Sequence, residues 1–195
     1  MSEDMNLKQG AVSKALLQEA GSGLQSAVWS EAGASALPYG DIIVTDGFNL
    51  KCQKVFHAVC PPWDNGGGQA EEELVSIIRF CLNEAENQRM TSLSFPAIGT
   101  GNLRFPRDVV SRVLLREVHS FSRRTTPLHL REVAVVVHPS DSQTVDCFTR
   151  DFKGQTGQRN IQREAREFNE ASWPISTSLS QSQQSPGKEP PAPII

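Results

Sequence analysis

Apolar residues recur every three or four positions in five stretches of the chain, a spacing that predicts helices with one buried face. In the first stretch the apolar stripe consists of Val12, Leu16, Leu17 and Ala20. Gly21 and Gly33 end the first two stretches, as glycine commonly does at a helix C-terminus. The helices are predicted at residues 13–20, 24–32, 70–87, 107–123 and 142–154.

Four shorter runs predict strands, and two of them, at residues 55–60 and 133–137, are almost continuously apolar, which is typical of strands covered on both faces. They alternate with the predicted helices, so the chain is expected to fold as an α/β sandwich with a mostly parallel or mixed sheet. His57 lies inside one of these runs, where a hydrogen-bonded core histidine is expected rather than a catalytic one. The strands are predicted at residues 41–45, 55–60, 92–96 and 133–137.

The composition changes after the last predicted helix. Residues 158–173 are polar, and residues 175–195 are rich in Ser, Gln and Pro, a composition that predicts disorder. The chain therefore divides into one domain at 6–153 and a polar linker or disordered tail at 154–195.

Charge and cysteine content exclude several classes of function. The net charge of -3 gives no basic footprint for DNA, and no apolar run is long enough to cross a bilayer. The four cysteines form no CxxC pair and lie in apolar surroundings, so buried free thiols in a reducing compartment are expected. The histidines show no metal-ligand spacing. We predict a cytoplasmic or nuclear protein without a metal site.

A glycine-rich segment joins the strand that begins at Ser92 to the helix that Pro106 opens. Two glycines, Gly99 and Gly101, flank Thr100, so the backbone there can adopt positive φ and approach a ligand closely. Successive N–H groups around a concavity bind anions, and a helix start supplies further donors. The pattern indicates a phosphate or pyrophosphate cradle. The alternative is a tight strand–helix turn in which the glycines only relieve a steric problem.

Two other segments leave a similar choice open. Gly10 precedes the first helix, as either a second phosphate-facing helix N-terminus or a plain helix start. The loop at 63–68 is either a lid or a solvated linker. A dinucleotide-binding enzyme is disfavoured, because Arg104 replaces the third glycine of a GxGxxG motif and no Walker lysine follows.

Together these segments resemble macrodomains, the modules that bind ADP-ribose. The resemblance is strongest to the macrodomains of macro-PARP proteins, mono-ADP-ribosyltransferases that carry several macrodomains in series. It covers roughly residues 6–153 and implies a three-layer α/β/α sandwich with a mixed sheet. The matching segments are Gly10–Val12 with the helix after it, Thr45-x-Gly47-x-Asn49-Leu50 leading to His57–Val59, and Pro96–Leu103 with Phe105–Pro106.

The resemblance also implies a role for each matching segment. One segment would line a first phosphate loop, another would wrap the diphosphate and the proximal ribose, and the end of the last strand at Val137–His138 would lie near the adenosine. ADP-ribose is then the ligand, with no cofactor, no metal and no catalytic residue. The implied binding residues are Gly10, Ala11 and Val12 in the first loop and Ala97, Ile98, Gly99, Thr100, Gly101, Asn102 and Leu103 in the second.

The chain departs from the family pattern in two places. Macrodomains open with strands ahead of the position of Gly10, and these supply an acidic residue for adenine and an asparagine beside the distal ribose. Here they are absent, so the domain is expected to be N-terminally incomplete, with an unpaired sheet edge. Arg104 stands where the family usually has a small residue, and Leu103 where an aromatic one is common.

Three functions follow. The first is a binding module for ADP-ribose or mono-ADP-ribosylated proteins, monomeric and without membrane or direct DNA contacts. The second is an ADP-ribosyl hydrolase, although no paired nucleophile and base is recognisable. The third is a scaffolding fragment that has lost affinity. The first is the prediction, with binding weakened by the missing strands, and enzymatic activity is left open.

Overall fold

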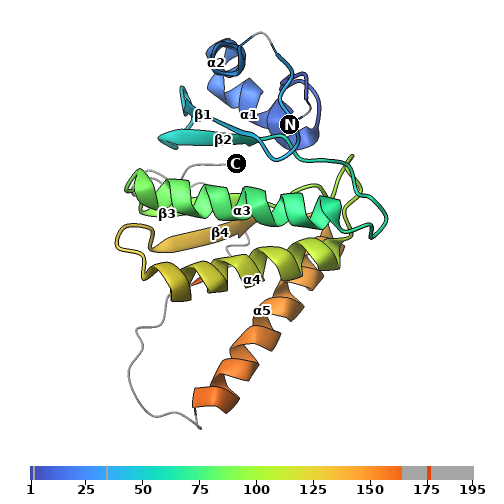
Figure 1. The fold of residues 1–195 in the computed structure, drawn as a ribbon, viewed down its shortest axis with the longest axis vertical. Helices are drawn as coiled ribbons and strands as arrows, with labels where there is room; N and C mark the ends of the chain where they lie inside the picture. Colours follow the sequence, from blue (N-terminus) through green and yellow to red (C-terminus); the bar gives the residue numbers. More distant parts are fainter. Residues whose placement is uncertain (2, 34, 164–174, 177–195) are drawn as a thin grey trace.

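The computed structural model describes residues 1, 3–33, 35–163 and 175–176. Helices and strands alternate along most of this part of the chain (Figure 1). The helices are α1 (Ala11–Ala20), α2 (Ser22–Ala32), α3 (Gln69–Asn87), α4 (Arg107–Thr125) and α5 (Ser142–Arg163). The strands are β1 (Ile42–Asp46), β2 (Lys54–Ala58), β3 (Ser92–Pro96), β4 (Glu132–Val136) and β5 (Ile175–Ser176).

The strands form two groups of different polarity. β1 and β2 pair antiparallel, with Val44 opposite Phe56, whereas β3, β4 and β5 pair parallel, with Phe95 opposite Val135. Within the described residues no strand pairing joins β2 to β3. Because antiparallel and parallel pairs both occur among the strands, the predicted mixed character of the sheet is confirmed. Figure 1 shows that α3, α4 and α5 all begin on the side of the molecule where β3 and β4 end.

Two apolar clusters cover the strands. The smaller one joins the N-terminal segment, α1 and α2 to the β1–β2 hairpin, and includes Leu7, Leu24 and Val55. The larger one joins α3 and α4 to β2, β3 and β4. The helical periodicity predicted most of these positions. Two predicted positions are exceptions: Val12, on the predicted stripe of the first helix, is 44% exposed, and Val136, in the strand predicted to be covered on both faces, is 45% exposed.

The carboxylate of Glu86, in the last turn of α3, holds the connection that leads into β4. It accepts hydrogen bonds from the amides of Leu128 (2.8 Å), His129 (3.1 Å) and Leu130 (2.8 Å). Burial by itself would raise the pKa of Glu86, but these amides outweigh it and hold the pKa below its ordinary value. The charged form is therefore favoured in the folded state.

We expect Glu86→Gln to lower the free energy of unfolding at neutral pH by about 1–2 kcal/mol, because a neutral amide accepts these N–H bonds less strongly. The depressed pKa means that the charged side chain stabilises the fold above the ordinary carboxyl range, and that this stabilisation is lost as pH falls through the folded-state pKa. Urea unfolding of both proteins over a pH series checks this. A stability difference that stays constant into strong acid would contradict it.

The end of the chain departs from the sequence prediction. α5 continues to Arg163 rather than ending near Gly154, since this glycine lies in open space on the helix surface and does not terminate it. Ile175–Ser176 forms β5 beside β4, inside the segment predicted to be disordered. The rest of that segment lies outside the described residues.

Candidate functional site

The loop between β3 and α4 is built by its own backbone hydrogen bonds. The Thr100 amide donates to the Ala97 carbonyl (3.3 Å), and the Phe105 amide donates to the Gly99 carbonyl (3.0 Å). Gly99 has φ 76°, and a Cβ added there would lie 2.7 Å from Cδ2 of Phe105. The loop therefore folds closely over the Phe105 ring, and only glycine fits at position 99.

Gly99 and Gly101 differ in backbone conformation, and the sequence could not show this difference. Gly101 does not adopt positive φ, and a Cβ there would meet nothing within 4 Å. The second left-handed position in the loop is Arg104, with φ 61°, whose amide donates to the Gly101 carbonyl (3.0 Å). The expectation that Gly101 supplies positive φ is thus wrong, because the turn from Gly101 to Arg104 places that conformation at its last residue.

Several amides of the loop have no hydrogen-bond partner among the residues that the structure describes. Across the described part of the chain, the N–H groups of Ile98, Gly99, Gly101, Asn102 and Leu103 donate no hydrogen bond. Gly101 and Asn102 are exposed, while the Ile98 side chain enters the larger apolar cluster and anchors the loop. Unpaired, accessible backbone donors at the end of a strand suit an anionic ligand.

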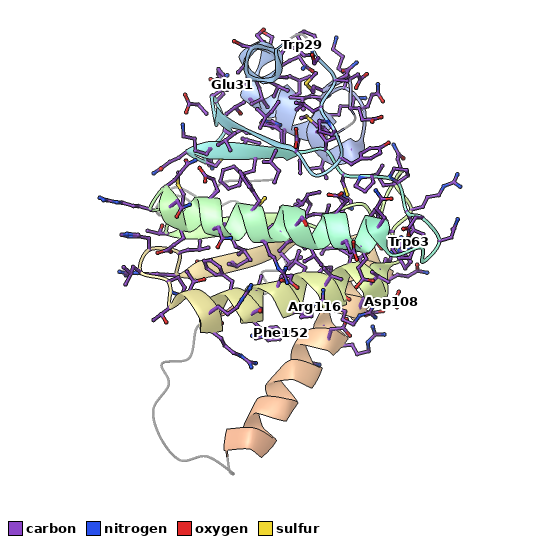
Figure 2. The ribbon with its side chains drawn as sticks, in the orientation of Figure 1. Trp29, Glu31, Trp63, Asp108, Arg116 and Phe152 are labelled. Atoms are coloured by element: carbon purple, nitrogen blue, oxygen red, sulfur yellow. The ribbon has the colours of Figure 1, made fainter. Side chains whose placement is uncertain are left out.

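The segment at 61–68 is tied to this loop. The Trp63 amide donates to the Leu103 carbonyl (2.8 Å), and the Trp63 ring packs against the Phe105 ring with centroids 5.3 Å apart. Asp64 accepts hydrogen bonds from Gly66 (3.3 Å) and Ala70 (3.1 Å). Figure 2 shows Trp63 beside the first turn of α3, on the side of the molecule where Asp108 marks the start of α4. Trp63 and Asp64 are therefore held by contacts to the loop and to the start of α3, whereas Asn65, Gly66 and Gly67 are exposed.

The other predicted loop precedes α1. Gly10 has φ 84° and caps the helix without a side-chain hydrogen bond, and its carbonyl accepts the Lys14 amide (3.1 Å). Ala11 and Val12 are exposed. Gln25 anchors the chain just before this start, since it accepts the Leu7 amide (2.8 Å) and donates to the Met5 carbonyl (2.9 Å). Within the described residues no hydrogen bond joins Gly10–Val12 to the loop at 97–103.

Comparison with known protein families shows which family this fold and its two loops belong to. The model of the family described as "Macro domain" matches residues 3–114, a range that contains both loops. This chain belongs to the macro domain family.

Relatives of this macrodomain include human Protein mono-ADP-ribosyltransferase PARP14, which is 36% identical over 76% of this chain. Another is Macro domain-containing protein XAC3343 from Xanthomonas axonopodis pv. citri, 35% identical over 50% of this chain. The aligned regions span 8% of the first protein and 55% of the second, so the similarity concerns one part of each relative.

Solved macrodomains share the fold. The Oceanobacillus iheyensis macrodomain solved with ADP is 26% identical, with a TM-score of 0.69 over 76% of this chain and 78% of that one. A mutant of that macrodomain was solved with ADPR, with a TM-score of 0.68, 25% identity, and 76% and 79% coverage. The Trypanosoma brucei macrodomain in complex with ADP-ribose, with a TM-score of 0.64 at 20% identity over 76% of this chain and 59% of that one, shows the same fold.

The buried titratable groups of the macrodomain are structural. His57 Nε2 lies 2.9 Å from Thr45 Oγ1, and burial, helped by the nearby charged amino group of Met1, lowers the pKa of His57 to about 4. Burial raises the pKa of Cys60 to about 12, so its thiol is unreactive. Cys52, Cys60 and Cys81 are buried as predicted, whereas Cys147, on α5, is only half-buried.

The described residues contain no group of three or more His, Cys, Asp or Glu side chains that could hold a metal ion. No helix in this part of the chain is long and apolar enough to cross a membrane.

Val137 and His138, which the family resemblance predicts to lie near the adenosine, directly follow the end of β4. His138 Nδ1 is 2.7 Å from Ser140 Oγ, and both residues are exposed. Just beyond, Asp141 starts α5 as its N-cap: its Oδ1 accepts the Thr144 amide (3.2 Å). The sequence carried no signal for the Trp63–Leu103 bond, because this bond joins residues far apart in the chain.

Proposed function

We propose that this macrodomain binds ADP-ribose, either free or attached to a protein as a mono-ADP-ribosyl group. The observation that carries the proposal is the set of unpaired amides of Ile98, Gly99, Gly101, Asn102 and Leu103, in the loop between the end of β3 and the start of α4. The family match over both loops and the related structures solved with ADP and ADPR support it.

The binding energy would come from backbone donors. The negatively charged oxygens of a diphosphate can accept hydrogen bonds from the amides of this loop and of the start of α1, and no side chain has to move for this. Hydrogen bonds to charged groups contribute about 1.5–3 kcal/mol each, so a few of them suffice for a stable complex. Because the loop is held by Phe105 and Trp63, little conformational entropy is lost on binding.

We propose recognition without catalysis. The first loop, Gly10–Val12, brings no acidic side chain. The carboxylate of Asp64, next to Trp63, accepts hydrogen bonds from backbone amides. The bond from the Ala70 amide in particular holds the pKa of Asp64 below its ordinary value. Such a carboxylate is a poor general base at neutral pH. The partners would be ADP-ribosylated proteins met by a monomeric reader in the cytoplasm or nucleus, where the free cysteines stay reduced.

Calorimetry with ADP-ribose tests the proposal. We expect saturable binding, with one site per chain, to the protein of residues 1–195. If millimolar ADP-ribose gives no heat of binding and no shift of the thermal midpoint, the proposal is contradicted and the scaffolding hypothesis is supported. Incubation with a mono-ADP-ribosylated protein forms the second arm. Retention of that protein without release of ADP-ribose supports a reader, whereas release would identify a hydrolase.

A further inference from the structure

Arg104 has an unusual combination of properties. Its backbone is left-handed, with φ 61°, a conformation that costs residues with a Cβ roughly 1–2 kcal/mol. Its side chain is exposed and, among the described residues, makes no hydrogen bond or ion pair. The side chain therefore does nothing within the fold that would offset the strain. Residues held in such conformations cluster at sites that bind ligands.

The position of Arg104 gives its charge a target. Its amide closes a four-residue turn on the Gly101 carbonyl, and the next residue, Phe105, closes onto Gly99. The guanidinium is thus tethered within one turn of the unpaired amides of Gly99, Gly101 and Asn102. The long arginine side chain can reach an anion seated on those amides, and its planar fork of donors matches phosphate oxygens.

The guanidinium of the neighbouring arginine, Arg107, already has partners within the protein. Arg107, the first residue of α4, has its Nε 3.3 Å from Asp141 Oδ1 and 3.0 Å from Thr144 Oγ1. Its guanidinium serves to hold the start of α5 against α4. Arg104 is therefore the cation that remains available at this loop, within the part of the chain described.

We propose that Arg104 is a binding residue of the site, and that its guanidinium pairs with the diphosphate held by the loop amides. The inference rests on the proposed function. It adds a charged side chain to what would otherwise be a cradle of backbone donors, and it makes part of the affinity sensitive to salt.

The chain contains a matched control. Arg89, in the turn between α3 and β3, is also exposed, has φ 58°, and donates its amide to the Glu86 carbonyl (2.9 Å). It lies at the opposite end of β3 from the loop. Replacing either arginine by glycine removes one positive charge and one left-handed side chain, so a difference between the two variants isolates the effect of position.

The test measures ADP-ribose affinity and thermal midpoint for the whole chain, Arg104→Gly, Arg104→Asn and Arg89→Gly, at low and high salt. We expect both glycine variants to melt about 2–4 °C higher, because glycine removes the left-handed strain. Arg104→Gly should bind about five- to tenfold more weakly at low salt and lose less affinity when salt is added. Arg104→Asn, which tolerates the same φ without charge, should lose as much affinity, and Arg89→Gly should bind as the parent does.

Three results would overturn the inference in different ways. If the parent binds ADP-ribose and both Arg104 variants bind it equally well, Arg104 is only a strained surface residue and the proposed function survives. If the parent binds neither ADP-ribose nor inorganic pyrophosphate, the proposed function fails and this inference fails with it. Equal weakening by Arg89→Gly would show a general charge effect rather than a contact at the loop.

Discussion

Replacing Gly101 by glutamate should abolish ADP-ribose binding while leaving the fold intact. The position is exposed, and a Cβ there meets no atom within 4 Å, so the new side chain fits without strain. Its carboxylate would lie beside the amides of Gly99 and Asn102, where the diphosphate is proposed to sit. Two like charges about 4 Å apart near a protein surface repel by about 4 kcal/mol.

This repulsion corresponds to a loss of affinity of at least about 100-fold, measurable by calorimetry. The control is Gly154→Glu, which adds the same charge at another open glycine, on α5. It should bind as the parent does, and both variants should melt close to the parent. Undiminished binding by Gly101→Glu would show that this loop is not where the ligand lies, whatever the family relationship.

Gly47→Ala should have the largest effect on stability. Gly47 turns the chain between β1 and β2: its amide donates to the Gln53 carbonyl, and its carbonyl accepts the Leu50 amide, both at 2.9 Å. A Cβ at this position would lie 2.0 Å from the backbone oxygen of Cys52. No rotamer change can relieve a clash with backbone, so the turn itself must open.

We expect the free energy of unfolding to fall by about 3 kcal/mol, a typical cost for forcing atoms into a packed site. Urea denaturation measures it. Gly154→Ala serves as the reference, because it adds the same methyl group on a helix with free space, and it should raise stability slightly. If Gly47→Ala unfolds at the same urea concentration as the parent, the close approach to Cys52 is not a constraint on the fold.

Periodicity was sufficient to predict most elements of the fold. Leu74, Ile77 and Cys81 recur at helical spacing, and all three are fully buried on α3. Patterns of this kind depend on local geometry, which the sequence records directly. The end of α5 was predicted wrongly because Gly154 usually signals a stop, and an exposed helix face tolerates it at a modest cost.

The loop was predicted in outline, but its internal constraints were not. Its glycines indicated a tight segment between β3 and α4, and the assignment of Ala97–Leu103 as binding residues stays a prediction from the family resemblance. The sequence could not tell that Gly99 is constrained by Phe105 while Gly101 is not. That distinction depends on a ring six residues further along the chain folding back over the loop. The left-handed Arg104 has no sequence signal either, since arginine rarely adopts that conformation and a turn alone forces it.

The bond between Trp63 and Leu103, together with the ring contact of Trp63 with Phe105, makes the shape of the loop between β3 and α4 depend on a segment that follows β2. If the loop binds the nucleotide as proposed, substitutions near Trp63 should change its affinity indirectly, by shifting the loop backbone while every proposed binding residue keeps its identity.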